Sequence, residues 1–563
     1  MYLRESRQKR ADGSVLTHLQ LAENLWDAAK QRARVQILYN CGRADDPAST
    51  ERLRRLAKSI LRRCAPEEIV AENPDWQVVN AWSYGDLYVL EQLWRRLGIP
   101  EVIAEVRAER KVDFDVERAL FAMVANRALA PSSKLYCYEQ WLQEEVHLEG
   151  AAGLSLQHLY RAMDFLEANK DAVEKALYFR MADLLNLDVE IVFYDTTSLH
   201  FEIDEPDQGS GPHDEVPGSR SAGAKTYPAL RKRGHAKNGR FDAPQIVVGL
   251  AVTRDGFPVR HWIFPGNTVD VSTVAKVKED LKGWHLSRCV FVGDAGMVSA
   301  ANLTTLARGG GKYIVCMPIH QGGVVERTVV ARPGRYQVVA DNLHVKEVIV
   351  GDGERRRRYV VCYNPQEAER QQQHRATILA ELEAELGSLR QQSGASHAKR
   401  VCELRASGRY GRYVRLNKNG RPRIHHAHVA ALARLDGKFI VHSNDDTLSA
   451  ADLALGYKQL QRVEVAWRSL KSGLKLRPVY HWAPHRIHAH VALTVLSLLL
   501  ERVAEHACGD TWRNLRDDLK HIKLAQLLSP NGTVWQVTEA SPDAAKRLKS
   551  LKIQKPPPIL HLA

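Results

Sequence analysis

The spacing of apolar residues changes along the chain, and each change predicts a different kind of structure. Residues 1–48 alternate polar and apolar positions around the turn Ala11-Asp12-Gly13, which is typical of a strand hairpin. Residues 49–187 carry apolar residues every three or four positions, as in TERLRRLAKSILRRC and DVERALFAMVANRAL. An Asp, Ser or Thr that could cap a helix stands near the start of each run. The first part is predicted to be a strand module and the second to be all-helical.

Two segments in these parts are candidates for contact with nucleic acid. Four of the first ten residues are basic, which suits a DNA-binding arm and a solvated extension about equally. In the helical region, SLQHLYRAMDFLEAN is the preferred DNA-facing helix of a helix-turn-helix. Because such helix pairs also build ordinary bundles, a bundle is the favoured interpretation of 49–187, with binding of DNA ends as its hypothetical role.

Beyond residue 188 the apolar runs become short and β-branched, as strands require. The runs DVEIVFYD, APQIVVGLAVTRDG, FPVRHWIFPGN, RCVFVGD and KYIVCMPI have helix-like segments between the later ones. The order is therefore β, β, β, α, β, α, β. A strand meander followed by αβ units predicts an α/β fold with a ribonuclease-H-like core, a mixed sheet flanked by helices.

The same patterns predict that this core is made of two separate parts. The first part covers 188–320 and the second 446–510, with an insertion domain at 321–445 between them and a C-terminal tail region at 511–563. In the insertion, Asn364 is placed to cap a helix whose first residue is Pro365 and whose Glu367 completes a capping box.

Three acidic residues are placed where metal-dependent phosphodiester chemistry would need them. Asp195 and Asp294 each close an apolar run, and Glu464 lies in the strongly helical segment YKQLQRVEVAWRSLK. Mg²⁺ needs few protein carboxylates, since water and substrate phosphate complete its shell. A pair of bound metal ions stabilises negative charge on both the attacking and the leaving oxygen. The three acids are therefore predicted to be catalytic and to bind Mg²⁺ or Mn²⁺, as two ions.

The helix of Glu464 also carries a stripe of cations. Glu464, Arg468, Lys471 and Lys475 recur at helical spacing, so that the cations could hold substrate phosphates beside a metal-binding acid. The alternative is an exposed helix with intrahelical salt bridges.

Two further segments are strongly basic and extend the predicted nucleic-acid surface. The loop 204–240 includes Lys237 and Arg240, and it is equally well explained as a solvated insertion. The segment 399–423 holds nine basic residues against one acid, with Tyr410 and Tyr413 between them. Phosphate contact with some aromatic stacking is the favoured use of this segment, through residues such as Arg409, Arg412 and Arg415.

Composition agrees with a large, basic, intracellular protein. The 563 residues include 80 Lys and Arg against 66 Asp and Glu, a net charge of +14 that favours a polyanionic partner. The eight cysteines have no zinc-like spacing and are interpreted as reduced thiols. The start of the chain has no apolar signal core, and the longest apolar run, 491–500, is too short for a bilayer. A cytoplasmic protein without a membrane partner is expected.

Taken together, these motifs resemble the DDE transposases of bacterial insertion sequences, in the superfamily whose third acid lies in a Tyr-Arg-Glu-Lys signature. The resemblance covers roughly 189–500 and rests on DTTSL, GHAKNGRFDAPQIVVGL, FPGNTVD, GDAGM and the Glu464 helix, in family order. It makes Tyr457 and Lys471 the first and last signature residues. The family's arginine falls on Leu460, so that either Arg462 or Arg468 substitutes for it or this branch of the family lacks it.

The resemblance implies an activity and its partners. Such a protein would bind double-stranded DNA at the ends of its insertion sequence, cleave it with divalent metal and join the 3′-hydroxyl ends to target DNA. It would act as a homodimer or higher oligomer, associated with the nucleoid when bound. Two alternatives stay open: a structure-specific nuclease on the same scaffold, and an inactive DNA-binding relic of a mobile element.

Overall fold

The computed structural model describes most of the chain, which divides into two compact units. The described residues are 1–10, 13–27, 31–61, 77–108, 112–185, 191–208, 229–235, 239–284, 286, 289–319, 323–391, 393–529 and 532–562. The smaller unit comprises Met1–Ala81, Ala525–Gln536 and Pro558–Ala563, and the larger one comprises Trp82–Leu524 and Val537–Pro557. The finer boundaries expected from the sequence stay predictions.

In its described residues, the smaller unit contains a three-stranded antiparallel sheet, one helix and most of a second, four-stranded sheet. Strands β1 (Tyr2–Lys9), β2 (Val15–Asp27) and β3 (Arg32–Arg43) form the first sheet, and the pairing of Lys9 with Val15 confirms the predicted hairpin. Helix α1 (Pro47–Leu61) follows. The second sheet has the order β18-β17-β16-β4, from strands β18 (Ile559–Leu562), β17 (Gly532–Val537), β16 (Lys523–Ser529) and β4 (Gln77–Ser83). The prediction that 49–187 is all-helical is therefore wrong at β4, which pairs with a strand from far along the chain.

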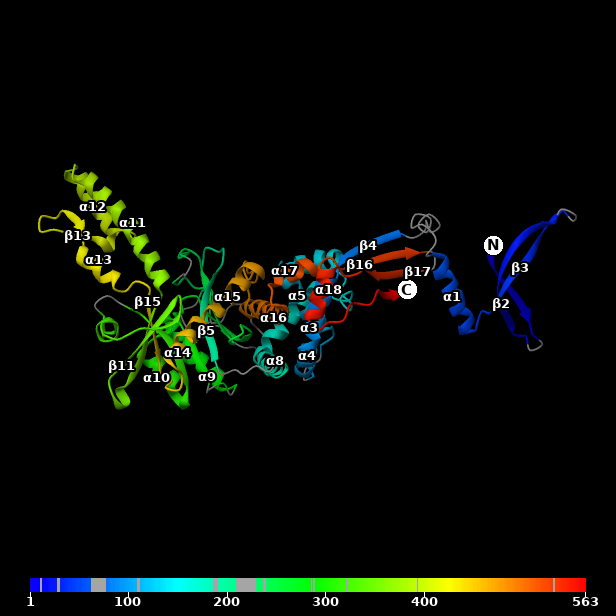
Figure 1. The fold of residues 1–563 in the computed structure, drawn as a ribbon, viewed down its shortest axis with the longest axis horizontal. Helices are drawn as coiled ribbons and strands as arrows, with labels where there is room; N and C mark the ends of the chain where they lie inside the picture. Colours follow the sequence, from blue (N-terminus) through cyan, green and yellow to red (C-terminus); the bar gives the residue numbers. More distant parts are fainter. Residues whose placement is uncertain are drawn as a thin grey trace. The chain divides into compact units, whose positions relative to one another are not determined.

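A helical bundle makes up one part of the larger unit (Figure 1). Its longest helix, α16 (Pro484–Cys508), packs against α5 (Val116–Leu129) and α7 (Leu156–Ala168). By length and composition α16 could cross a membrane, but 89% of its apolar window is buried inside the protein. The other helices of this part are α3 (Gly85–Arg96), α4 (Ile99–Arg107), α6 (Lys134–Tyr136), the π-helical η1 (Cys137–Glu145), α8 (Lys170–Leu184), α17 (Trp512–Leu519) and α18 (Pro542–Ser550).

The segment that was the preferred DNA-facing helix is α7, and it is part of this bundle. Ser155 and His158 form a reciprocal capping box at its start. Leu159, Ala162, Met163 and Leu166 are buried, because α7 lies against both α5 and α16. The bundle interpretation is therefore confirmed for α7.

A nine-stranded mixed sheet makes up the other part of the larger unit (Figure 1), in the order β10-β11-β12-β15-β9-β8-β5-β6-β7. The predicted order β, β, β, α, β, α, β is observed. It consists of β5 (Ile191–His200), β6 (Gln245–Val252), β7 (Pro258–Pro265), α9 (Asp270–Lys282), β8 (Val290–Gly293), α10 (Ala300–Ala307) and β9 (Lys312–Met317). Only β5, β8 and β9 pair in parallel.

The predicted insertion region adds four strands to this same sheet. Strand β15 (Lys438–Ser443) pairs with β9, and β12 (Arg357–Tyr363), β11 (Leu343–Val350) and β10 (Gln337–Ala340) continue outward from it. The rest of the region forms a small separate cluster. It comprises α11 (Pro365–Leu389), α12 (Gly394–Ala406), α13 (His426–Ala433), β13 (Val414–Leu416) and β14 (Pro422–Ile424). The Asn364 side chain accepts hydrogen bonds from the Gln366 and Glu367 backbone N–H groups, as the predicted cap requires.

Helices cover both faces of the nine-stranded sheet. On one face the Tyr194 hydroxyl donates a hydrogen bond to Thr273 of α9, at 3.0 Å. On the other face, Gly456 of α14 (Ala450–Lys458) lies against Ile314. Phe193, Val292 and Ile314 are register partners and therefore share that second face. Helix α15 (Gln461–Arg468) follows α14 directly and contacts β5 and β6.

Candidate active site

The first two predicted acids lie at neighbouring positions of two parallel strands. Phe193 of β5 pairs with Val292 of β8, so that two residues further along Asp195 stands opposite Asp294. Strand β8 ends at Gly293, directly before Asp294. The prediction that β5 ends at Asp195 is wrong, because β6 continues to pair with it as far as His200. Asp195 instead lies at the point along β5 where the pairing with β8 ends.

Asp195 and Asp294 also share a face of the sheet. Side chains alternate along a strand, so Asp195 lies on the same face as Phe193, away from α9 and toward α14. On that face the Tyr457 hydroxyl of α14 donates a hydrogen bond to Asp294 Oδ1, at 3.1 Å. Burial, with nearby Cys316 and Asp294, raises the pKa of the Tyr457 phenol further above neutral, so its hydroxyl is the donor in this contact.

The third acid, Glu464, is exposed on α15. Val463, Ala466 and Trp467 are the buried residues of this helix, which they seat on the protein core. The helix contacts β5, the strand that carries Asp195. Within the described residues, no three His, Cys, Asp or Glu side chains are grouped closely enough to hold a metal ion.

The residues present nevertheless fit a hard divalent cation. Mg²⁺ is usually held by one or two carboxylates together with water and substrate phosphates. The neighbouring carboxylates of Asp195 and Asp294 meet that requirement, and Glu464 lies on a helix packed against the same strand. The complete triad stays a prediction.

The predicted stripe of cations after Glu464 does not continue as a regular helix. Helix α15 ends at Arg468, and a π-helical turn, η7 (Ser469–Gly473), follows it. Lys475 then adopts a left-handed backbone conformation, with φ of 44°. A π-helical turn has more residues than an α-helical turn, so Lys471 and Lys475 leave the α-helical register of Glu464 and Arg468.

The position that departs from the Tyr-Arg-Glu-Lys signature has a structural explanation. Leu460 is 8% exposed and belongs to the core, where an arginine would be buried. Arg462 and Arg468 are exposed and line one large cavity together with Lys475. Either arginine is therefore free of the core and accessible to a substrate.

Comparison with known proteins agrees with this geometry. The model of the Transposase DDE domain family matches residues 213–500, just over half of the chain. The chain belongs to the DDE transposase family. It is a transposase enzyme of the DDE type, which confirms the family resemblance predicted from the sequence.

Two solved transposase structures are similar to this transposase, at low identity. One is the cryo-EM structure of the piggyBac transposase synaptic complex with hairpin DNA, with 10% identity, a TM-score of 0.32 and coverage of 78% of this chain and 79% of that chain. The other is the Mos1 transposase paired-end complex with left transposon end, with 14% identity, a TM-score of 0.13 and coverage of 37% and 55%. TM-scores this low do not establish a shared fold. Comparison with curated proteins gives no match.

Some of the basic residues predicted to bind DNA are already paired with acidic side chains of the transposase, and others are exposed. Lys237 lies outside the described residues. Arg240 is paired with Asp242 and Glu202, at 3.0 and 3.3 Å, and Arg409 is paired with Glu381, at 2.5 Å. A DNA phosphate would have to displace these acids. Arg412 and Arg415 are exposed, and Arg415 lines a hollow of about 450 Å³ with other basic side chains.

Of the two tyrosines in the basic segment, Tyr413 is not available for the predicted aromatic stacking. This ring is 6% exposed and belongs to the core formed by Leu382, Leu386 and Leu404. Arg412 lies over its ring, with 5.7 Å from Cζ to the ring centroid. The Tyr410 hydroxyl donates a hydrogen bond to Glu381, so this ring too is held by the protein.

Sequence reasoning missed one acid close to the candidate active site. Asp270, the first residue of α9, accepts a hydrogen bond from the hydroxyl of Thr196, the residue after Asp195. Asp270 is the last residue of the motif FPGNTVD, and this motif could have indicated it from the sequence. Its position on the opposite face of β5 suits it to fixing this strand rather than to meeting substrate.

Proposed function

We propose that this transposase binds the ends of its insertion sequence, cleaves the DNA with divalent metal and joins the 3′-hydroxyl ends to target DNA. The observation that carries the proposal is the side-by-side placement of Asp195 and Asp294 on the face that α14 covers. The proposal includes a ribonuclease-H-like core, with Glu464 as the third catalytic acid. The metal is Mg²⁺ or Mn²⁺, as two ions.

Each residue has a distinct part in the proposed chemistry. Asp195, Asp294 and Glu464 hold the cations, which when bound stabilise charge on the attacking and leaving oxygens. The Tyr457 hydroxyl fixes the direction of the Asp294 carboxylate through its hydrogen bond. Arg468 and Lys471 hold the phosphates of the strand being cut, and they orient it for in-line attack. The partner is double-stranded DNA, bound by a homodimer or higher oligomer in the cytoplasm.

The experiment that tests this function uses DNA that flanks the coding region. The protein is incubated with labelled flanking duplexes, a target plasmid, and Mg²⁺, Mn²⁺ or EDTA. We expect metal-dependent nicking at a fixed end and covalent joining to the plasmid. Cleavage at branched or nicked DNA without joining would indicate a structure-specific nuclease. Binding without cleavage in either metal would indicate an inactive relic.

Replacing Tyr457 by Phe is expected to slow cleavage about tenfold without weakening DNA binding. The substitution removes one hydroxyl that aligns Asp294 and leaves the ring in place, and supporting groups of metal ligands are typically worth about 10–100-fold. The measurement is the single-turnover cleavage rate over a range of Mg²⁺ concentrations. A raised Mg²⁺ requirement is expected, and an unchanged rate and requirement would remove Tyr457 from the site. Tyr88→Phe, which removes a hydroxyl bonded to the Gln554 carbonyl, is the matched control.

Neutralising two exposed arginines of the basic segment is expected to weaken DNA binding and its salt dependence. Arg412→Ala and Arg415→Ala together should lower the slope of log affinity against log salt by about two, since each phosphate contact contributes about 0.9. Arg400 is the matched control, because it is already paired with Glu385 and Glu403 at 2.9 Å. If the double variant had the same slope of log affinity against log salt as the wild type, Arg412 and Arg415 would not contact DNA phosphates.

A further inference from the structure

The segment after the helix of Glu464 is held by side chains of the helical bundle, and the proposed chemistry does not yet use these contacts. Beyond η7 the chain continues through Leu474, Lys475 and Leu476, and both leucines are fully buried. Lys475 between them has the left-handed φ of 44°, which ends the helical path. The last carbonyl groups of a helix have no partner inside the helix. These carbonyls therefore need donors from elsewhere in the protein.

Arg127 of α5 supplies donors to two of these carbonyls. Its Nη1 donates to the Lys475 carbonyl, at 3.1 Å, and to the Leu474 carbonyl, at 3.4 Å. Its Nη2 donates to the carbonyl of Ser132, in the loop after α5, at 3.1 Å. Among the residues that the structure describes, no acid forms an ion pair with Arg127. The guanidinium instead faces the negative end of the helix dipole of α15 and η7, which it caps.

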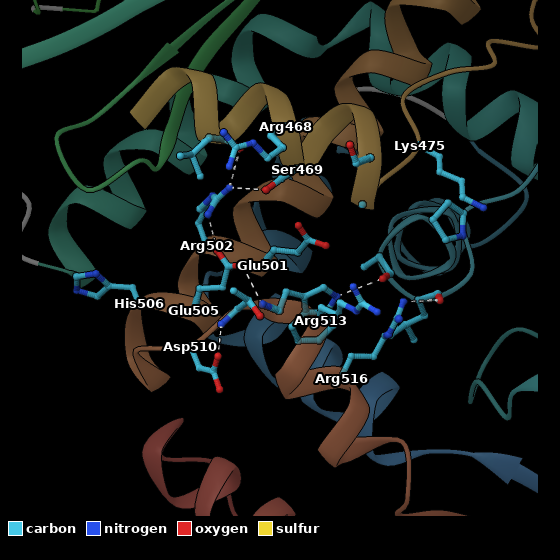
Figure 2. A pocket seen from close by; sticks show the side chains of 18 of the residues that line it. Arg468, Ser469, Lys475, Glu501, Arg502, Glu505, His506, Asp510, Arg513 and Arg516 are labelled. Atoms are coloured by element: carbon cyan, nitrogen blue, oxygen red, sulfur yellow. Dashed lines mark hydrogen bonds and ion pairs between the residues drawn. The ribbon is translucent and has the colours of Figure 1, made fainter. Parts of the chain in front are cut away.

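Helix α16 holds the same segment at two further points. The Nε2–H of His490 donates to the Leu476 carbonyl, at 3.2 Å. Burial, and then Arg127, lower the pKa of His490 well below its ordinary value, so the ring is neutral and donates through this one N–H. Figure 2 shows the other point, where Arg502 donates to the Ser469 hydroxyl at the start of η7, at 2.6 Å. Both ends of η7 are thus tied to the bundle.

Arg127 is a buried charge in a place that disfavours other charges. It is 3% exposed, and burial lowers its pKa only to about 10, so it stays charged at neutral pH. Lys134 beside it has a buried Nζ without a hydrogen bond to any described residue. Burial, and then Arg127, lower the pKa of Lys134 to about 7. A buried charge costs free energy that its hydrogen bonds only offset, so stability alone does not explain an arginine where an apolar side chain would fill the space.

The anchored segment is continuous with the helix of the third acid. Helix α15 ends at Arg468, one helical turn after Glu464, and η7 follows directly. The same helix contacts β5, the strand of Asp195. A shift of η7 would therefore move Glu464 along β5, and the contacts with the bundle set where this acid stands.

We propose that Arg127 and His490 are positioning residues for the third acid. By holding the carbonyls of residues 474–476, they keep Glu464 in reach of the cations that Asp195 and Asp294 would bind. The inference rests on the proposed function, because it gives these two residues a part in that chemistry. Both side chains are buried, at 3% and 2% exposure, so they act through the segment they hold and not through contact with DNA.

Replacing Arg127 by Met is expected to lower the single-turnover cleavage rate about 10²-fold, the effect of misplacing a group by about 1 Å. DNA binding in EDTA should stay within about twofold, because Arg127 is buried. Arg127→Lys keeps a charged donor and should restore the rate to within about tenfold of wild type. The matched control is Arg96→Met, which should cleave at the wild-type rate. Arg96 makes the same kind of cap at the end of α18, where it donates to the carbonyls of Leu551, at 2.8 Å, and Lys552, at 3.1 Å and φ of 54°.

Hydrogen exchange measured by mass spectrometry, without DNA or metal, tests the placement independently of cleavage. Amides of 461–476 should exchange faster in Arg127→Met than in the wild type, whereas those of β6 should not change. Thermal melting shows which variants are folded. If Arg127→Met does not fold, His490→Leu removes only the Leu476 contact and should show both effects in the same direction.

Two results would overturn the inference and leave the proposed function in place. One is unchanged exchange of 461–476 in a folded Arg127→Met variant. The other is faster exchange of this segment together with cleavage at the wild-type rate. Absence of cleavage by the wild type itself would instead overturn the proposed function, and the positioning role of Arg127 with it.

Discussion

Replacing Asp294 by Asn is expected to lower metal-dependent strand cleavage about 10²–10³-fold, the size of effect seen when one charge-stabilising group is removed from an active site. The substitution keeps the shape and the hydrogen-bond acceptor that Tyr457 meets at 3.1 Å. What it removes is the negative charge that would hold a divalent cation opposite Asp195. DNA end binding should stay within about twofold, because duplex affinity depends on cationic side chains and not on this carboxylate.

The measurements are single-turnover cleavage of the flanking duplex and, separately, its binding in EDTA. Asp446→Asn is the matched control, since this exposed acid is paired with Arg356 and lies in a surface loop after β15. We expect wild-type cleavage from it. If Asp294→Asn cleaved DNA at the wild-type rate, the pair Asp195 and Asp294 would not be the metal site. The placement of these two acids would then no longer support the proposed function.

Local sequence signals predicted the position of Asp294 at the end of its strand. A strand that is buried on both faces has a continuous apolar run, and the first polar residue after RCVFVG is Asp294, directly after β8. The cap at Asn364 was predictable for the same reason, because one side chain satisfies the first backbone N–H groups of α11. In both cases the deciding interaction lies within a few residues in the sequence.

Other features depend on partners far away in the sequence, and these the sequence could not indicate. Strand β5 continues past Asp195 because β6, some fifty residues later, still pairs with it. Part of the expected insertion joins the central sheet because β15 adds to β9 across more than a hundred residues. Arg409 looked available for phosphate, but Glu381 of a neighbouring helix already pairs with it. The π-helical turn after Arg468 likewise leaves no pattern in residue spacing.

The candidate active site also depends on a close contact between backbone segments, at Gly266, where only glycine fits. Gly266 lies in the motif FPGNTVD, between β7 and α9. Its N–H donates to the Leu230 carbonyl at 2.9 Å, and its own carbonyl accepts from the Gln245 side chain at 2.8 Å. A Cβ at this position would lie 1.9 Å from the Gln245 carbonyl oxygen and 2.3 Å from that of Lys232. Both oxygens belong to backbone that is itself paired, so neither can move aside without breaking hydrogen bonds.

Gly266→Ala is therefore expected to destabilise the larger unit by about 3 kcal/mol or more, in the range of severe single substitutions. For a unit of more than 400 residues, with an unfolding entropy of about 2.1 cal/mol/K per residue, that corresponds to a melting temperature lower by roughly 3 °C. The measurement is thermal unfolding followed by circular dichroism. Gly387→Ala is the matched control: its Cβ would meet no atom within 4 Å, and alanine is favoured over glycine inside helix α11. Equal melting of Gly266→Ala and wild type would mean that the backbone of Lys232 and Gln245 does not pack against Gly266 as described. Cleavage should fall together with stability, because this crossing anchors β6 and α9 beside the strand of Asp195.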